Sequence, residues 1–503
     1  MEDRVMFEDV FVDAQRTPFI TRWFGEAQPY LRARWIFLRT LGCIFFSAFY
    51  ALYFQIHGLI GPDGILPAAA YLSTARNAVG SRAYWYIPSL LWFGAGDRAL
   101  SALVWIGIAA SLAIIFNLWP RLSIAIAGIC FLSFVSAAQD FSSYQSDGML
   151  LEAAFLSLFF APRGLRPRLG ITHPPTRAAL FLLQWEWFRI YFESGLVKIL
   201  SGEEQWRNLT AMDKYYENGP LPAWIGWYVQ HWPHAFHAFT AATTLIVELF
   251  VVWLLFLPKR SRLIAFCITT PLQIGIILTA NYAFLNYLVL FLGILLLDDR
   301  VLRLEAGMPA PRKPSYAIVV AAILFFFTSI EMFIFPGAPL LNAPAIVASP
   351  FRIVNSYGLF AVMTRARYEI EFQGSNDQVN WTPYPFRYKP QDVKERPGIY
   401  APYQPRFDWN LWFASLGTVE DNRWVMNTQV RLLENSAPVL RLFRANPFPG
   451  RPPGAVRVVV WQYWFSTREE KARAGVWWDR KLLGSYAPTA VRQADGSVTF
   501  REP

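Results

Sequence analysis

Long apolar runs constrain this 503-residue chain more than any other feature. A helix needs about 20 apolar residues to cross roughly 30 Å of hydrocarbon. Runs of that kind lie at 34–56, 98–118, 121–139, 177–200, 235–258, 262–280 and 316–336, and two shorter runs at 148–162 and 283–297 bring the predicted number of spans to nine. The segment 84–95 is shorter and contains Pro88, so we expect it to lie at the membrane interface or to re-enter the membrane.

The composition and the charge pattern agree with a bilayer. Hydrophobic residues make up 54% of the chain and charged residues only 16%, which leaves too little polar surface to cover several soluble domains. The net charge is +10, and nine spans with a cytoplasmic N-terminus place every basic cluster on the cytoplasmic side. These clusters lie at 16–34, 121, 163–177, 259–262 and 300–313, whereas the outer loops 139–148 and 201–234 lean acidic. We therefore expect a lipid bilayer as partner and no nucleic acid.

This pattern predicts three parts. Residues 1–33 form a cytoplasmic N-terminal segment, 34–336 a transmembrane helical domain with the outer loop 201–234, and 337–503 a C-terminal extracytoplasmic domain, because nine spans are an odd number. The last part changes character, since no run of membrane length follows residue 350.

The C-terminal part is predicted to mix strands and helices. Residues Tyr368 to Phe372 alternate as a half-buried strand does, and Ala455 to Trp464 form a second strand. Residues 408–416 and 424–443 are predicted to be helical. The expected fold class is a multi-pass α-helical membrane protein of about nine spans with a C-terminal β-rich α+β extramembrane domain.

Charged residues inside a span are costly and are candidates for function. Glu186, Arg189 and Glu193 are spaced i, i+3 and i+7, so they share one face of the helix predicted at 177–200. The structural interpretation is an ion-pair ladder that orients this helix, with Glu152 and Glu248 of other spans finding partners on the same face. A transporter would instead place Glu248 and other polar residues along a pathway, but no repeated half of the chain is visible.

Lys198 leaves two interpretations open. It lies on another face of the same predicted helix, near the outer end of the span. There the side chain either extends to the membrane surface or serves as a desolvated catalytic base.

No complete catalytic motif or metal motif is present. The three cysteines, Cys43, Cys130 and Cys267, all lie in apolar runs and form no CxxC pair. His231, His234 and His237 have three-residue spacing, but Pro233 interrupts a helix there, so we interpret them as interfacial and predict no metal site and no cofactor. Sequons at Asn208 and Asn380 fall in segments predicted to lie outside the membrane.

Several long blocks resemble the lipase maturation factor family. They are Tyr144-Gln-Ser-Asp-Gly-Met-Leu-Leu-Glu152, Gly195-Leu-Val-Lys198 with Trp206-Arg-Asn-Leu-Thr210, Tyr215-Tyr-Glu217, Asn355-Ser-Tyr-Gly-Leu-Phe360 and Ala401-Pro-Tyr-Gln-Pro-Arg-Phe-Asp-Trp409. The resemblance extends from about Gly58 to beyond Phe413. Gly219-Pro220 and Tyr403 depart from the family pattern, which usually has Gln-Pro and His at these places.

The resemblance implies a membrane-embedded factor that assists folding and assembly of secreted homodimeric lipases. It places animal members in the endoplasmic reticulum membrane and bacterial members in the plasma or inner membrane, and the chain's length and lack of a retention signal favour a bacterial member. We expect the client, a secreted lipase-like protein, to contact exposed residues of the outer loop and the C-terminal domain. These are Trp206, Arg207, Tyr215, Tyr216, Glu217, Tyr403, Arg406, Asp408 and Trp409.

A fainter similarity supplies the alternative. Gly195-Leu-Val-Lys198 followed by Trp206 resembles the membrane segment of vitamin K-dependent γ-carboxylase. That resemblance implies a quinone-dependent intramembrane enzyme with Lys198 as base. Whether the chain catalyses any reaction is left open by the sequence.

Overall fold

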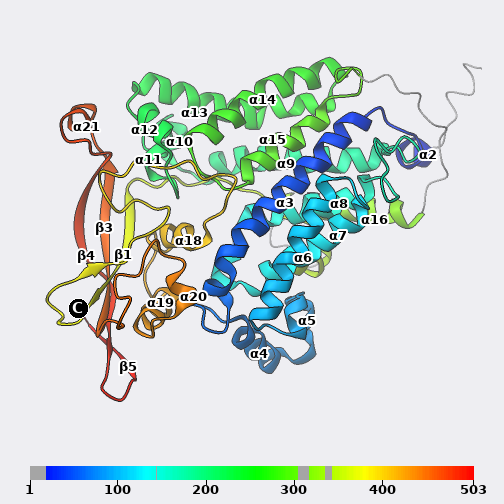
Figure 1. Cartoon of the computed structure of the whole chain (residues 1–503). Coiled ribbons are helices and arrows are strands. Elements are labelled where there is room, and N and C mark those ends of the chain that lie inside the picture. The colour runs from blue at the N-terminus through cyan, green and yellow to red at the C-terminus, as the bar shows by residue number, and fades with distance from the viewer. Residues whose placement is uncertain (1–18, 143, 304–315, 335–342, 503) are drawn as a thin grey trace, which may run out of the picture.

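The computed structural model describes residues 19–142, 144–303, 316–334 and 343–502. Figure 1 shows a bundle of helices at one end of the molecule, a twisted sheet at the other, and the helices α18, α19 and α20 between them. The predicted N-terminal segment up to residue 18, and the predicted boundary between residues 336 and 337, lie outside the described residues.

Every predicted apolar run contains a helix. The helices are α3 (Leu31–Ile60), α6 (Asp97–Ile115), α7 (Pro120–Ala137), α8 (Gln145–Phe160), α9 (Arg177–Leu200), α13 (His234–Leu249) continued by the 3-10 helix η4 (Val251–Phe256), α14 (Lys259–Thr279), α15 (Leu285–Gly293) continued by η5 (Ile294–Leu296), and α16 (Tyr316–Ile334). Within the described residues, five of them are long and apolar enough to cross a membrane: α3, α6, α7, α13 with η4, and α14. The protein is therefore an integral membrane protein with several apolar helices.

Shorter helices fill the remaining parts of the bundle. They are α2 (Phe19–Phe24), α4 (Ala68–Val79), η1 (Gly80–Arg82), α5 (Ala83–Tyr86), η2 (Leu90–Phe93), η3 (Gln139–Ser142), α10 (Glu204–Arg207), α11 (Tyr215–Asn218), α12 (Trp224–Gln230), α17 (Ala343–Ala348) and η6 (Ser349–Phe351). The segment predicted to be interfacial, 84–95, forms two such short pieces, and its Trp85 and Phe93 are exposed, as aromatic residues at a membrane surface are.

The C-terminal sheet is antiparallel, with strand order β2-β1-β3-β4-β5. Its strands are β1 (Arg367–Ser375), β2 (Thr382–Pro383), β3 (Ala455–Phe465), β4 (Trp478–Arg492) and β5 (Val498–Arg501). The two predicted strands correspond to β1 and β3, and β1 pairs with β3 along its whole length, from Arg367 opposite Tyr463 to Ser375 opposite Ala455. Three short helices accompany the sheet: α18 (Arg406–Ala414), α19 (Trp424–Leu433) and α20 (Ala437–Leu440), while α21 (Arg468–Ala474) joins β3 to β4.

One helix prediction in this domain is wrong. Residues 424–443 do not form a single helix, because α19 ends at Leu433 and Asn435 has a positive φ of 55°. Pro438 then lies in the first turn of α20, where a missing backbone N–H is tolerated. The chain turns between the two helices as a result.

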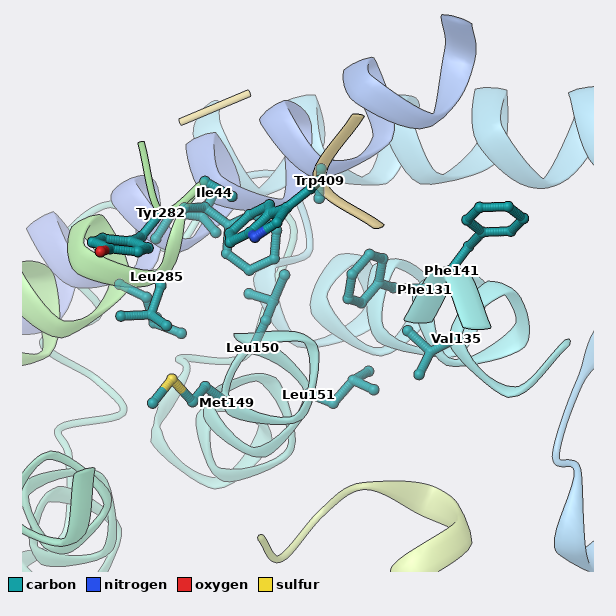
Figure 2. Close-up of a cluster of buried hydrophobic side chains, with 14 of the residues drawn as sticks. Ile44, Phe131, Val135, Phe141, Met149, Leu150, Leu151, Tyr282, Leu285 and Trp409 are labelled. Atoms are coloured by element: carbon teal, nitrogen blue, oxygen red, sulfur yellow. The ribbon is translucent and has the colours of Figure 1, made fainter. Parts of the chain in front are cut away.

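One continuous apolar core joins the bundle to the sheet domain. Figure 2 shows Trp409 of α18 lying among side chains of the membrane helices, including Ile44, Phe131 and Leu150. These side chains are almost completely withdrawn from solvent. Burial of a large aromatic side chain stabilises a fold by about 2–3 kcal/mol, so this contact fixes α18 to the bundle.

Candidate functional site

The charged side chains of α8 and α9 meet the chain segment that leads into the sheet domain. We call this contact the polar seam: Glu152 of α8, Arg189, Glu193 and Lys198 of α9, Glu248 of α13, and the segment 353–361. All five helix residues have side chains that are mostly or fully buried. Buried charges need partners, so the partners explain why these residues are there.

Arg189 is the centre of the seam. One of its terminal nitrogens donates to the Glu152 carboxylate, and the other donates to the backbone carbonyl of Asn355 at 2.8 Å. The same nitrogen lies 3.8 Å from the Glu193 carboxylate. The guanidinium thus joins two helices and the connecting segment.

The two glutamates bind the backbone of that segment. Glu152 accepts hydrogen bonds from the Asn355 backbone N–H at 3.0 Å and from the Tyr357 hydroxyl at 2.8 Å. Glu193 accepts the Tyr357 backbone N–H at 2.6 Å. Hydrogen bonds to a charged group are about twice as strong as neutral ones, so these carboxylates anchor a segment that has no secondary structure of its own.

A glycine permits this close approach. A Cβ atom on Gly148 of α8 would lie 2.6 Å from the Asn355 side-chain oxygen. The Asn355 amide donates to the Gly148 carbonyl at 3.1 Å and to Glu152 at 3.1 Å. Both residues belong to the sequence blocks 144–152 and 355–360, which therefore form one contact.

Lys198 extends the seam towards α13. Its ammonium group donates to both Glu248 carboxylate oxygens, at 3.0 and 2.8 Å, and to the carbonyls of Ser194 and Leu359, at 3.2 and 3.0 Å. A Cβ atom on Gly195 would lie 2.7 Å from Glu248 Cβ, so a glycine here lets α13 come near enough for the pair. The ammonium has three protons, and these four acceptors use all of them.

The loop predicted as 201–234 continues the same attachment outside the bundle. Trp206 donates its indole N–H to the Phe360 carbonyl at 2.9 Å, and Asn218 donates to the Thr364 carbonyl at 2.7 Å. Arg367, at the start of β1, donates to the carbonyls of Glu217 at 3.0 Å and Pro220 at 3.1 Å. The connecting segment is thus held from Asn355 to Arg367.

A second attachment joins α8 to α18. Arg406 forms two hydrogen bonds of 2.8 Å with the Asp147 carboxylate and a third with the Phe141 carbonyl, and both charged side chains are buried. Tyr144 donates to Asn410 at 2.7 Å, and its ring stacks on Trp409. This bidentate pair fixes the orientation of α18 on the bundle.

The predicted ladder on α9 is only partly present. Arg189 and Glu193 do face each other, but both carboxylate oxygens of Glu186 are buried without a hydrogen-bond partner. We expected Glu248 to find a partner on the face of Glu186 and Glu193. It forms an ion pair with Lys198 instead. Lys198 does not extend to the membrane surface either, since its side chain is 2% exposed.

Most residues predicted to form the outer client-binding surface are not at the surface. The buried ones are Trp206, Tyr215, Tyr216, Glu217, Arg406, Asp408 and Trp409. Their expected exposure is wrong because they join the sheet domain and the outer loop to the bundle. Arg207 is exposed and Tyr403 is half-buried, so these two keep an accessible side chain.

The three histidines bind separate partners. His231 contacts the carbonyls of Trp227 and Ser466, and His234 lies 2.9 Å from Asp213. His237 is buried, and both its ring nitrogens lack a hydrogen-bond partner. Within the described ranges no group of three or more His, Cys, Asp and Glu side chains is arranged to hold a metal ion.

An aromatic cleft of about 960 Å³ lies between the C-terminal end of α3, the N-terminal end of α6 and the sheet domain. Tyr53, Phe54 and Trp105 form its membrane-side wall and are about half exposed. Arg387 and Arg441 line the opposite wall and are exposed.

Asp408 also lines the aromatic cleft and has an unusual titration. Burial raises the pKa of Asp408 to about 6, although hydrogen bonds from the backbone N–H groups of Tyr388 and Lys389 act in the opposite direction. The nearby Lys389 ammonium also favours the charged form. A carboxyl of this kind changes its charge near neutral pH.

Apolar helices with a charged inner seam, and a sheet domain attached along that seam, define a class: a multi-pass membrane protein with an extramembrane α+β domain. Comparison with known families narrows the class. The family model described as the lipase maturation factor transmembrane domain matches residues 32–304, and the model of the lipase maturation factor C-terminal domain matches residues 353–488.

Similarity along the whole chain points to the same family as the two family models. The chain is 32% identical to lipase maturation factor 1 of Bos taurus, over 92% of this chain and 89% of that protein. It is 32% identical to lipase maturation factor 1 of Homo sapiens, over 90% and 87%, and 29% identical to lipase maturation factor 2 of Gallus gallus, over 92% and 82%. The chain belongs to the lipase maturation factor family.

No solved structure matches this chain. The alternative of a quinone-dependent carboxylase-like enzyme gains no support from the comparisons. The geometry of Lys198 agrees, because an ammonium group whose protons are all bound within the protein is suited to holding the seam.

Proposed function

We propose that this chain is a membrane-embedded maturation factor that assists the folding and assembly of a secreted lipase-like client. One observation carries the proposal: the similarity to lipase maturation factor 1 extends over both the membrane helices and the sheet domain, at 92% of this chain. The seam supports it, because a sheet domain held rigidly at the membrane surface is a fixed platform for a client that emerges there.

The proposed topology has nine crossings, a cytoplasmic N-terminus and the sheet domain outside. It is supported by the basic clusters between the spans. The membrane would be that of the endoplasmic reticulum in an animal cell and the plasma or inner membrane in a bacterium. Expression with microsomes tests the orientation, because Asn208 and Asn380 are both exposed sequon residues. We expect glycosylation at Asn380. If Asn380 is not glycosylated and a sequon introduced before Leu31 is, the topology is the reverse of the one proposed.

We propose the aromatic cleft as the place where the client is bound. Its membrane-side wall carries Tyr53, Phe54 and Trp105, and its other wall the cations Arg387 and Arg441. Aromatic and arginine side chains dominate binding energy at protein interfaces. The cleft therefore suits a partly folded client segment with exposed apolar side chains and acidic neighbours.

A secretion assay tests the function and the cleft together. A homodimeric lipase is expressed in cells that lack their own maturation factors, with and without this chain, and lipase activity per amount of secreted protein is measured. We expect the wild-type chain to raise this specific activity. An unchanged activity at normal expression of the chain would contradict the proposed function.

Charge reversal in the cleft tests the site. We expect the double variant R387E/R441E to lose most of the gain in specific activity, whereas R451E, an exposed arginine outside the cleft, keeps it. If the double variant keeps full activity but loses binding to phospholipid vesicles, the cleft binds lipid headgroups and not the client.

A further inference from the structure

A second cavity, of about 310 Å³, lies between the membrane helices and the loop that follows α9. One face of α13 lines it with Phe236, Thr240, Thr244 and Glu248, which follow one another at four-residue spacing. The other walls come from α9, α14 and α15, from the loop between α9 and α13, and from Leu359 and Phe360 of the connecting segment. Its volume is at the lower end of the range for sites that bind small molecules, and it suits one extended chain.

The walls are apolar and the polar groups are already paired. Tyr191 accepts a hydrogen bond from Gln273 at 2.8 Å, and Gln273 accepts one from Asn286 at 2.8 Å. The hydroxyls of Thr240 and Thr244 donate to carbonyls of their own helix, which leaves their methyl groups for the cavity. Most of the lining thus has the character of hydrocarbon.

The ion pair of Lys198 and Glu248 also lines the cavity. The two charges cancel, so a ligand with a charged head would leave an unbalanced charge in a low dielectric. Glu248 accepts hydrogen bonds from Lys198 only, among the hydrogen bonds of the described residues, and its side chain is 13% exposed. A carboxylate has about four acceptor positions, so it has room for a hydroxyl donor.

The cavity opens towards lipid between α13 and α14. Among the five long apolar helices of the described residues, these two are the least covered: 22% and 17% of their most apolar stretches are buried, against 61% for α3. Pro271 and Gly275 of α14 line the cavity and are exposed as well. A Cβ atom on Gly275 would meet nothing within 4 Å, so the space beside it is open. Figure 1 shows α13 and α14 along one edge of the bundle.

We propose that this cavity binds a neutral single-chain lipid with a hydroxylated head, the chemistry of a monoacylglycerol. The chain enters from the bilayer between α13 and α14 and contacts the apolar walls. The head lies beside the pair of Lys198 and Glu248 and donates a hydroxyl hydrogen bond to Glu248. This site is separate from the aromatic cleft, and it holds whether or not that cleft binds a client.

Photolabelling tests the proposal with the full chain in phosphatidylcholine nanodiscs. The probe is a monoacylglycerol with a diazirine in its acyl chain, and labelled peptides are found by mass spectrometry. We expect labels on α13 and α14 residues that line the cavity, and competition by unlabelled monoacylglycerol. Labels spread over all lipid-facing helices without competition would overturn the site, and equal competition by the fatty acid of the same length would overturn the neutral head.

Two substitutions at one position provide the matched control. We expect G275F to lower the affinity for the probe about tenfold or more, because the ring occupies the opening, and G275A to leave it nearly unchanged. The thermal midpoints of both variants show whether they fold. If G275F folds and binds the probe as the wild type does, the lipid does not enter between α13 and α14. The secretion assay is a separate measurement. If the chain does not raise lipase activity there, the result on lipid binding still stands.

Discussion

Helices α9 and α14 have nearly the same length, 24 and 21 residues, but opposite environments. Most of α9 is buried, and it carries the charged residues of the seam. Only Ala265, Thr269 and Gln273 of α14 are buried, and several of its long apolar side chains are exposed, among them Ile264, Ile268 and Leu278. For these two helices, the comparison teaches that the charges of α9 mark where the second part of the protein is attached, whereas α14, which contributes no residue to the seam, exposes much of its apolar surface.

Removal of the central cation should have the largest effect. In R189M, Glu152 and Glu193 lose their charged partner inside the protein, and we expect a loss of about 4 kcal/mol in the free energy of unfolding. Chemical unfolding in detergent micelles measures it. R207M removes an exposed arginine and serves as control. A loss below about 1 kcal/mol would mean that the seam does not hold the two parts together.

The sheet domain should respond to pH independently of the seam. The Asp408 carboxyl has a pKa of about 6 in the folded protein and near 3.8 when unfolded, so the folded state binds the proton more tightly. Its contribution is therefore fully present below pH 4 and is lost as the pH rises through 6, on the order of 3 kcal/mol in all.

D408N tests this because an amide cannot ionise but still accepts hydrogen bonds. We expect the stability difference between D408N and the wild type to change between pH 4 and 7 in favour of D408N. Thermal midpoints of the two proteins over this range measure the change. If the stability difference between D408N and the wild type is the same at every pH in this range, the pKa of Asp408 is the same in the folded and the unfolded chain.

The pair at the α13 end of the seam should matter less than Arg189. K198M leaves Glu248 without its cation, and we expect a loss of about 2–3 kcal/mol because the Glu248 side chain keeps some exposure. The double variant K198M/E248L should regain part of this loss, since no charge is left unpaired. Equal losses in the single and double variants would contradict the pairing.

The smallest effect is expected on the lipid-facing side of α14. Leu278 is 46% exposed, so L278A should change the free energy of unfolding by less than about 0.5 kcal/mol. Measurement in the same micelles as R189M makes the comparison direct. A loss similar to that of R189M would mean that α14 is covered by protein, for example in an oligomer.

The sequence predicted the apolar helices well because their signal is local. A run of apolar side chains must leave water, whatever the rest of the chain does. Strand β1, with its alternating residues, and strand β3 were equally readable. In contrast, β4 was not predicted, because its outward residues from Asp479 to Leu483 are mixed in character and partly or fully exposed.

The seam was only half predictable. The charges on α9 were recognised as costly, but their partners lie far along the chain: Tyr357 is 164 residues from Glu193, and Asn355 is 203 residues from Glu152. No periodicity connects such residues. The one available signal was the grouping of the two blocks in a family resemblance, and it gave no contact. The burial of Arg406 and Trp409 was missed for the same reason.

Hydrogen exchange of the backbone amides in residues 353–361 tests the central claim most directly. The N–H groups of Asn355, Tyr357 and Gly358 donate to Glu152, Glu193 and Gln145. We expect these amides to be protected as strongly as those of α9 in the wild type, and to exchange much faster in R189M. Exchange in the wild type at the rate of an exposed loop would contradict the account, because the sheet domain would then not be fixed to the membrane helices through the seam.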